Sequence, residues 1–189
     1  MKKKVRQELI KVRKSILKED VFEKSIEIKG NLFDLTEFKE ASNILFYVSY
    51  DNEVNTHDMI KESMKKKKNV IVPISDKINR SLILSELKNW DDLEQGSYGI
   101  FEPRKEKIKE IPIEKIELII VPGVGFDEKG NRIGHGKGFY DNLLRNSTNI
   151  PHIGLAFESQ ILKEIPIQSH DLPVHKIVTE KRVIDCKNN

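Results

Sequence analysis

Hydrophobic positions recur along the chain in blocks whose spacing predicts alternating helices and strands. Near the start, Val5, Leu9, Val12 and Ile16 follow one another at helical spacing. Similar patterns predict further helix around residues 20–41, so the first part of the chain is expected to be helical. Short apolar runs then predict buried strands at 43–49, 70–74, 81–87, 118–121 and 152–157. Helical patterns occupy residues 55–68 and 138–144.

This alternation of strands and helices predicts an α/β fold. We expect a three-layer arrangement in which a mainly parallel central sheet is flanked by helices. The stretch 99–112 contains two prolines and interrupts the order, but it is too short to mark a linker, and no internal repeat is found. The chain of 189 residues is therefore predicted to form a single domain, 1–189.

Composition narrows the class of protein. Hydrophobic residues make up 38% and charged residues 33%, and the formal net charge of +3 is too mild to predict nucleic-acid binding. No apolar run approaches the roughly 20 residues of a membrane span. The single cysteine, Cys186, excludes an internal disulfide and a multi-cysteine metal site. We expect a cytoplasmic protein without membrane or nucleic-acid partners.

The stretch 121–141, VPGVGFDEKGNRIGHGKGFYD, has the chemistry of a phosphate-binding loop. Backbone N–H groups approach an anion closely where side chains are absent, and Arg132, His135 and Lys137 add positive charge. It is not a Walker A motif, because Asn131 stands where the first glycine should be and Gly138 where the hydroxyl should be. The glycine spacing of a dinucleotide fingerprint also fails. The loop predicts an ATP or phosphate site, and a Gly-rich surface loop with solvated cations is the alternative.

Individual residues of this loop have two interpretations each. Lys137 suits a point charge on a phosphate, and Arg132 a fork that holds phosphate oxygens or a carboxylate; both could be surface charges. Tyr140 could stack on a ring or belong to the core. Asp141 could hold Mg²⁺ against a phosphate or complement a helix dipole.

A second polar segment follows the first predicted strand, at residues 49–56. Ligands of open α/β sheets sit beyond the carboxyl ends of the strands, so this segment and the glycine loop are expected at one site. Glu53 could accept hydrogen bonds from ring N–H and amino groups of a substrate, or the segment could only cap a helix through Asn55 or Thr56.

Together these motifs resemble the 5-formyltetrahydrofolate cyclo-ligase family, also called 5,10-methenyltetrahydrofolate synthetases. The resemblance rests on the long glycine motif at 122–141, the Ser-x-x-x-Glu segment at 49–53 and the basic N-terminal helix. It implies an ATP- and Mg²⁺-dependent conversion of 5-formyltetrahydrofolate to 5,10-methenyltetrahydrofolate, with release of ADP and phosphate. The implied route passes through a phosphorylated formyl group, an N5-iminium phosphate, which N10 attacks.

The resemblance also implies roles for particular residues. Lys137 and Arg132 correspond to the catalytic cations. The implied ATP-binding residues are Lys2, Lys3, Lys4, Val5, Arg6, Arg132, Ile133, Gly134, His135, Gly136, Lys137, Gly138, Phe139 and Tyr140. The implied folate-binding residues are Val48, Glu53, Tyr98 and Tyr140, and the implied Mg²⁺ ligands are Asp141 and Asp171. Tyr98 stands where relatives often carry Trp, and Phe139 replaces the commoner Tyr.

Partners and rival functions complete the expectations. We expect a monomer that acts on small molecules, and the basic stretches 65–68 and 105–109 could attract a polyglutamate tail or be solvated helix ends. One rival function is a non-catalytic nucleotide-binding regulatory module. Another is a phosphosugar isomerase or acyl-CoA transferase on a related scaffold, because fold alone does not decide function.

Overall fold

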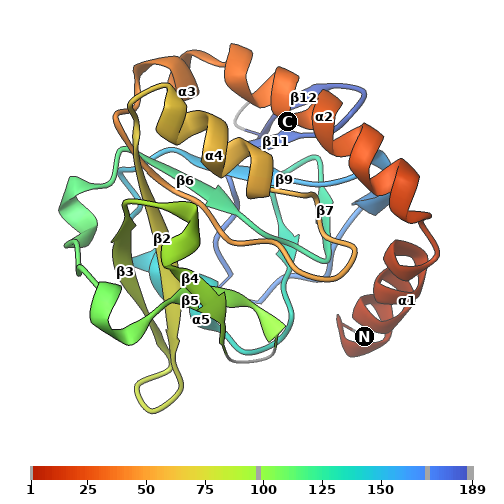
Figure 1. Cartoon of the computed structure of the whole chain (residues 1–189). Helices are drawn as coiled ribbons and strands as arrows, with labels where there is room; N and C mark the ends of the chain where they lie inside the picture. Colours follow the sequence, from red (N-terminus) through yellow and green to blue (C-terminus); the bar gives the residue numbers. More distant parts are fainter. Residues whose placement is uncertain (1, 97–98, 169–170, 187–189) are drawn as a thin grey trace.

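The computed structural model describes residues 2–96, 99–168 and 171–186, and its centre is a seven-stranded sheet (Figure 1). The strand order is β12-β11-β9-β6-β1-β2-β3. The strands are β1 (Asn43–Leu45), β2 (Asn69–Asp76), β3 (Ser81–Leu87), β6 (Leu118–Val121), β9 (His152–Leu155), β11 (Lys176–Val178) and β12 (Val183–Asp185). The five inner strands are mutually parallel, and β3 and β12 pair antiparallel at the two edges. The prediction of a mainly parallel sheet is confirmed.

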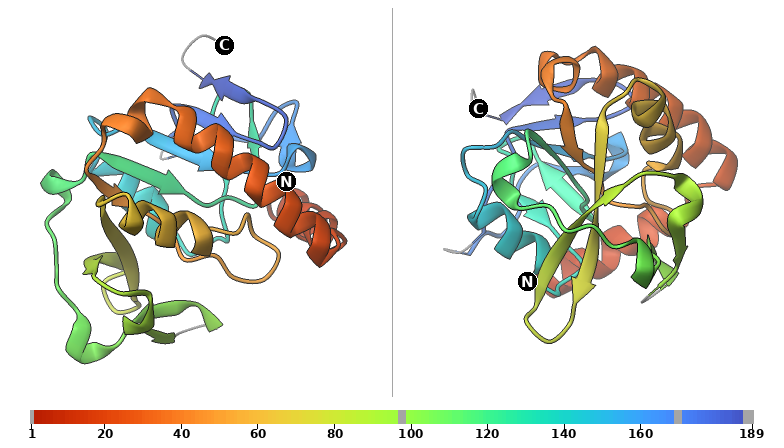
Figure 2. Two further views of the ribbon diagram at one scale, coloured as in Figure 1. Left: turned by 45° about the horizontal axis from the view of Figure 1, so that its top comes forward. Right: turned by 60° about the vertical axis from the view of Figure 1, so that its left-hand side comes forward.

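Helices cover both faces of this sheet, as predicted. The first part of the chain forms α1 (Lys2–Lys14), α2 (Lys18–Asp34) and α3 (Thr36–Glu40). Helix α4 (His57–Lys65) lies beside α2 and α3 on one face, and α5 (Phe139–Arg145) covers the other (Figures 1 and 2). Helix α1 lies apart from these layers, at one end of the molecule (Figure 1).

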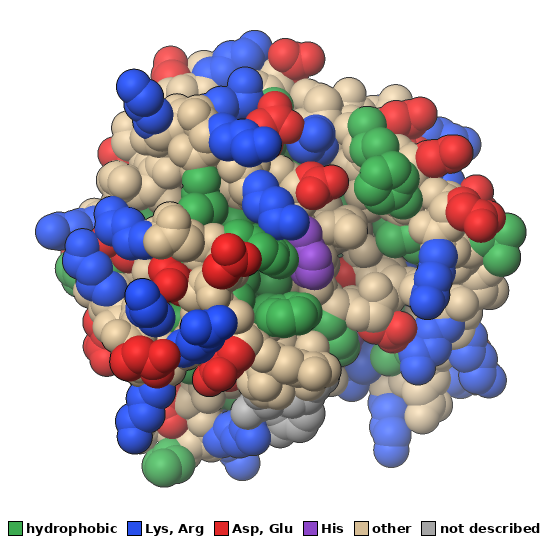
Figure 3. Space-filling model, viewed as in Figure 1, with side chains coloured by type: hydrophobic (Ala, Val, Ile, Leu, Met, Phe, Trp, Pro, Cys, Tyr) green, Lys and Arg blue, Asp and Glu red, His purple; other side chains and the backbone are tan. Residues whose placement is uncertain are grey.

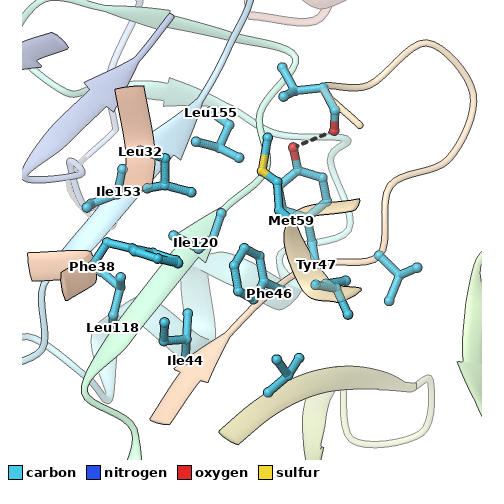
Figure 4. Close-up of a cluster of buried hydrophobic side chains, with 14 of the residues drawn as sticks. Leu32, Phe38, Ile44, Phe46, Tyr47, Met59, Leu118, Ile120, Ile153 and Leu155 are labelled. Atoms are coloured by element: carbon cyan, nitrogen blue, oxygen red, sulfur yellow. Dashed lines mark hydrogen bonds between the residues drawn. The ribbon is translucent and has the colours of Figure 1, made fainter. Parts of the chain in front are cut away.

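The alternation of side chains explains why the inner strands are continuously apolar. Along β1 and the residues after it, Ile44 and Phe46 face the core under α2, α3 and α4, whereas Leu45 faces the core under α5. β6 alternates in the same way, with Leu118 and Ile120 on the first face (Figure 4). Because both faces are covered, neither set of positions tolerates polar residues.

The strand predicted at 43–49 is shorter in the structure than expected. Only Asn43–Leu45 forms ladder pairs, although Phe46 to Ser49 stay buried. Beyond Phe46, side chains replace the ladder: Thr56 Oγ1 accepts from Ser49 N at 3.0 Å and donates to Tyr47 O at 2.7 Å. The chain is thereby released from the sheet where the candidate site begins.

Smaller elements that were not predicted complete the fold. They are too short to show a hydrophobic period. A three-stranded sheet has the order β10-β7-β8, and a two-stranded sheet joins β4 and β5. Their bounds are β4 (Leu93–Gln95), β5 (Phe101–Pro103), β7 (Gly125–Asp127), β8 (Arg132–Ile133) and β10 (Ile161–Leu162). Single 3-10 turns occur at Trp90–Asp92, Lys105–Lys107, Ile113–Lys115 and Glu158–Gln160.

Surface charge and helix length can be compared with the predictions about nucleic-acid and membrane partners. On the face in Figure 3, basic and acidic side chains are interspersed, and hydrophobic side chains gather near a histidine. This mixture agrees with the small net charge of +3. Within the described ranges, no helix has the length and apolar character that a membrane crossing requires.

His152, at the start of β9, is a buried titratable group outside the candidate site. Its Nε2 lies 3.0 Å from Ser147 Oγ, its ring stands 5.0 Å from that of His175, and its Nδ1 has no hydrogen-bond partner among the described residues. Burial, followed by the nearby His175, lowers the pKa of His152 from 6.5 to about 4. The native state therefore requires a neutral imidazole at this position.

We expect His152 to make the protein less stable in mild acid. The unfolded chain takes up a proton near pH 6.5 and the folded chain only near pH 4, so stability is fully present above 6.5 and declines as the pH falls towards 4. Gln stays neutral at all these pH values. The variant His152→Gln should therefore lose less free energy of unfolding over this pH range, by up to about 3 kcal/mol. Urea unfolding of both proteins at several pH values measures the difference. Parallel pH curves for wild type and His152→Gln would contradict this assignment.

Candidate active site

A cavity of about 140 Å³ lies beyond the carboxyl ends of the central strands, where ligands of such sheets bind. Its walls come from the segment after β1, the β2–β3 hairpin, the start of β5 and the glycine loop that leads into α5. The lining residues are Tyr47, Val48, Tyr50, Glu53, Pro73, Ser75, Leu82, Ile100, Glu102, Pro122, Arg132, Gly134, His135, Gly136, Lys137, Gly138, Phe139, Tyr140 and Asp141.

The two polar segments expected at one site meet in this cavity. His135 Nε2, from the glycine loop, lies 3.0 Å from Glu53 Oε1, from the segment after β1. The rings of Tyr50 and His135 are 5.8 Å apart. A carboxylate suited to a polar ring therefore adjoins a glycine loop suited to phosphate.

Glu53 is buried, with only 6% of the residue exposed, and polar contacts hold its carboxylate from three directions. Its Oε1 faces both His135 and Arg13, whose Nη1 is 3.4 Å away, and its Oε2 accepts from Tyr50 N at 3.2 Å. Tyr47, behind it, donates its hydroxyl to Val54 O at 3.1 Å (Figure 4). The helix that follows is capped by Asn55, whose Oδ1 accepts from His57 N, while Thr56 bonds back to the strand.

The glycine loop depends on backbone conformations that favour glycine. Gly136 and Gly138 have φ angles of +91° and +77°. A Cβ on Gly136 would also lie 3.0 Å from Arg6 Nη1, so Arg6 would have to shift slightly. The positive φ is therefore the stronger reason for glycine at this position.

Of the predicted cations on helix α1, Arg6 contacts the glycine loop: its Nε donates to Gly134 O at 2.7 Å. Lys2 pairs with Asp171 instead. Lys3 and Lys4 are exposed and do not line the cavity. Two apolar residues predicted to bind ATP pack instead: Val5 and Ile133 belong to the apolar cluster around Leu9.

Arg132 and Asp141 form an ion pair in the cavity wall. The Arg132 guanidinium also lies 3.4 Å from Pro122 O, and its Nε has no hydrogen-bond partner among the described residues. Burial lowers the pKa of Arg132, and the Asp141 carboxylate opposes that shift. The Tyr140 hydroxyl is likewise buried without a partner among described residues, and burial raises its pKa. Two hydrogen-bonding groups in this wall are thus available to a ligand.

Carboxylates for a metal are present but do not form a protein cage. Asp141 lines the cavity and Asp171 pairs with Lys2 from α1, and both carboxylates act electrostatically on Arg132. Among the described residues, no group of three or more His, Cys, Asp or Glu side chains is arranged to hold a metal ion. Such a pair suits Mg²⁺ that takes its other ligands from phosphates and water.

Sequence reasoning missed several lining residues and one buried neighbour. Tyr98 lies outside the described residues, but Ile100 and Glu102 from the same stretch line the cavity. Glu102 Oε1 accepts from Ser75 N at 3.1 Å, a contact that no local pattern indicates. Arg13 could have been found, because it follows Arg6 by two helical turns and so lies on the same face of α1.

Comparison with known proteins identifies the family of the chain. The model of the 5-formyltetrahydrofolate cyclo-ligase family matches residues 1–180. The chain belongs to this family. It is therefore an enzyme of the cyclo-ligase type, and the family resemblance of the glycine motif is confirmed.

Individual cyclo-ligases are similar to the chain over most of its length. The 5-formyltetrahydrofolate cyclo-ligase of Haemophilus influenzae is 31% identical over 179 residues, which cover 92% of this chain and 95% of that protein. A probable cyclo-ligase of Schizosaccharomyces pombe is 34% identical, with 85% of each chain covered. The solved structure of Aquifex aeolicus 5,10-methenyltetrahydrofolate synthetase superimposes with a TM-score of 0.88 at 30% identity, covering 100% of this chain and 94% of that one. The cyclo-ligase fold thus extends over the whole chain.

Proposed function

We propose that this cyclo-ligase converts 5-formyltetrahydrofolate to 5,10-methenyltetrahydrofolate and consumes ATP in doing so. The observation that carries the proposal is the contact between Glu53 and His135, because it joins a ring-binding carboxylate to a phosphate-binding loop. A reaction that transfers phosphate to a folate needs these two functions side by side. The names of the relatives support the same folate substrate.

The chemical difficulty is the formyl oxygen, which is a poor leaving group. In the proposed route that oxygen attacks the γ-phosphorus of ATP and ADP leaves, which gives an N5-iminium phosphate. N10 then attacks the activated carbon and gives up its proton to solvent, the C–O bond breaks, and phosphate departs as the ring closes. The protein must align the reactants and neutralise charge rather than supply a covalent nucleophile.

The residues of the cavity match these needs. Lys137 supplies a mobile point charge for the transferred phosphate, and Arg132 a planar cation at the base of the loop. The backbone of 134–138, with Arg6 and Lys2 from α1, surrounds the triphosphate. Glu53 accepts from the pterin ring, while Val48, Phe139 and Tyr140 contact the folate or the nucleotide from the cavity wall.

Asp141 and Asp171 would hold Mg²⁺ in this proposal. When bound, the ion supplies charge neutralisation for the triphosphate. Asp141 is well placed because its carboxylate lies at the cavity wall beside Arg132. The pairing of Asp171 with Lys2 would bring the start of α1 to the same phosphates.

A cytoplasmic monomer that accepts folates with or without a polyglutamate tail remains our expectation. The exposed lysines at 65–67 and the lysines at 105–109 are candidates for attracting such a tail. Charge reversal at Lys105 and Lys107 should then weaken the binding of polyglutamated folate more than the binding of the monoglutamate.

The rival functions make different predictions about ATP. A regulatory module would bind ATP regardless of folate and release no ADP. An isomerase or acyl-CoA transferase would work without ATP and would need a carboxylate free to move protons. Glu53 is engaged by Arg13, His135 and the Tyr50 backbone, which favours binding over proton transfer.

The direct test mixes the protein with 5-formyltetrahydrofolate and MgATP. We expect the near-ultraviolet absorbance of the methenyl product and the release of ADP to rise together in equal amounts, and neither to rise when one substrate is omitted. ADP release without product, or ATP binding without turnover, would contradict the proposed function.

A further inference from the structure

Arg13 is a buried cation that the proposed function does not use. Its side chain, in the last turn of α1, is 2% exposed. Its Nη1 donates to Glu53 Oε1 at 3.4 Å, and its Nε has no hydrogen-bond partner among the described residues. A guanidinium is costly to bury unless a charge partner compensates it. The ion pair with Glu53 supplies that compensating charge, so the two side chains act together.

The helix that carries Arg13 contacts the glycine loop near its start and Glu53 at its end. Lys2, Arg6, Leu9 and Arg13 are spaced four, three and four positions apart, so they share one face of α1. Arg6 reaches Gly134 O, and Leu9 packs in the cluster that includes Val124 and Ile133. At the far end, Asn52 Nδ2 donates to the carbonyls of Arg13 and Ile16, at 3.2 and 2.9 Å. The turn that presents Glu53 is thus fastened to the end of α1.

The other groups around Glu53 differ from Arg13 in charge or in position. Burial raises the pKa of Tyr47, Tyr50 and Tyr140, so these phenols are neutral near pH 7. Tyr50 N contributes only a dipole. His135 reaches Glu53 from the glycine loop, with its Nε2 at 3.0 Å, and its side chain is partly exposed. Arg13 is the buried guanidinium of this group.

We propose that Arg13 is a positioning residue that holds the Glu53 carboxylate aimed at the folate ring; this rests on the proposed function. A carboxylate held in this way presents acceptor lone pairs to the ring N–H and amino groups. Arg13 does not line the cavity, so it acts through Glu53 and not on the substrate. Its loss should impair folate binding selectively.

The test compares Arg13→Met with wild type by calorimetric titration of 5-formyltetrahydrofolate and, separately, of ATP. We expect folate affinity to fall about tenfold or more and ATP affinity to change less than about twofold. Arg13→Lys, which keeps the charge, should recover part of the affinity. Lys14→Met, at the exposed neighbouring position, is the matched control.

A double variant distinguishes positioning from a general structural role. In a Glu53→Gln background the partner charge is gone, so Arg13→Met should cost less than about twofold further in folate affinity. If Arg13→Met alone does not fold, the double variant, which buries no unpaired charge, should fold and the Arg13→Lys result decides. Equal losses in both backgrounds, or equal losses of folate and ATP, would overturn the role of Arg13 alone. Wild-type protein that binds no folate would overturn the proposed function and this role together.

Discussion

Lys137→Ala should reduce turnover by about a thousandfold while the protein stays folded. The side chain is exposed at the cavity, so its removal leaves no hole in the core. A cation placed where charge develops in the transition state contributes about 3 to 4 kcal/mol to the lowering of the barrier. The loss should appear in the turnover number, because in the proposed function the glycine-loop backbone and Arg6 would still hold the triphosphate.

The measurement is steady-state formation of the methenyl product with saturating substrates, together with a thermal unfolding curve. Lys129→Ala is the matched control, because Lys129 is exposed in the turn between β7 and β8, does not line the cavity, and its side chain pairs with Glu164 at 3.9 Å. Lys137→Arg keeps the charge with a different shape and should retain part of the rate. Near-normal turnover by Lys137→Ala would contradict a catalytic role for the glycine loop.

The sequence predicted five of the seven strands of the main sheet and missed β11 and β12. The run at 118–121 coincides with β6, since a strand with a core on both faces demands an unbroken apolar segment. The run at 81–87 coincides with β3, an edge strand that is only partly buried. The run at 43–49 was read as one strand, although the ladder ends at Leu45. Hydrophobicity alone cannot distinguish a buried segment that pairs with a neighbouring strand from one that does not. Here the hydrogen bonds between Ser49 and Thr56 take the place of strand pairing.

The site was predictable where local chemistry is dense and unpredictable where it depends on tertiary contact. Glycines and cations within 132–138 identified a phosphate loop without any structure. In contrast, Glu102 enters the cavity because β5 carries it there against Ser75, and Arg13 reaches Glu53 from α1 without lining the cavity itself. Such residues carry no local signal, and only the placement of their elements brings them to the site.

Glu53→Gln should weaken folate binding by about a hundredfold and leave ATP affinity nearly unchanged. A buried site designed to pair with N–H and amino donors loses strongly when one acceptor becomes a donor, since a group of the ligand then remains unpaired. The same change removes the counter-charge of Arg13, which is 2% exposed. We therefore expect a second effect, a lower free energy of unfolding by up to about 3 kcal/mol.

These two effects are measured separately, by titration of folate and of ATP and by urea unfolding. Asp51→Asn is the matched control, because Asp51 is exposed on the same turn and does not line the cavity. The Glu53→Gln protein should still bind ATP at temperatures where it is folded, since the glycine loop keeps its contact with Arg6. If ATP and folate affinity fell by the same factor, Glu53 would be a support for the whole cavity rather than the group that recognises the ring.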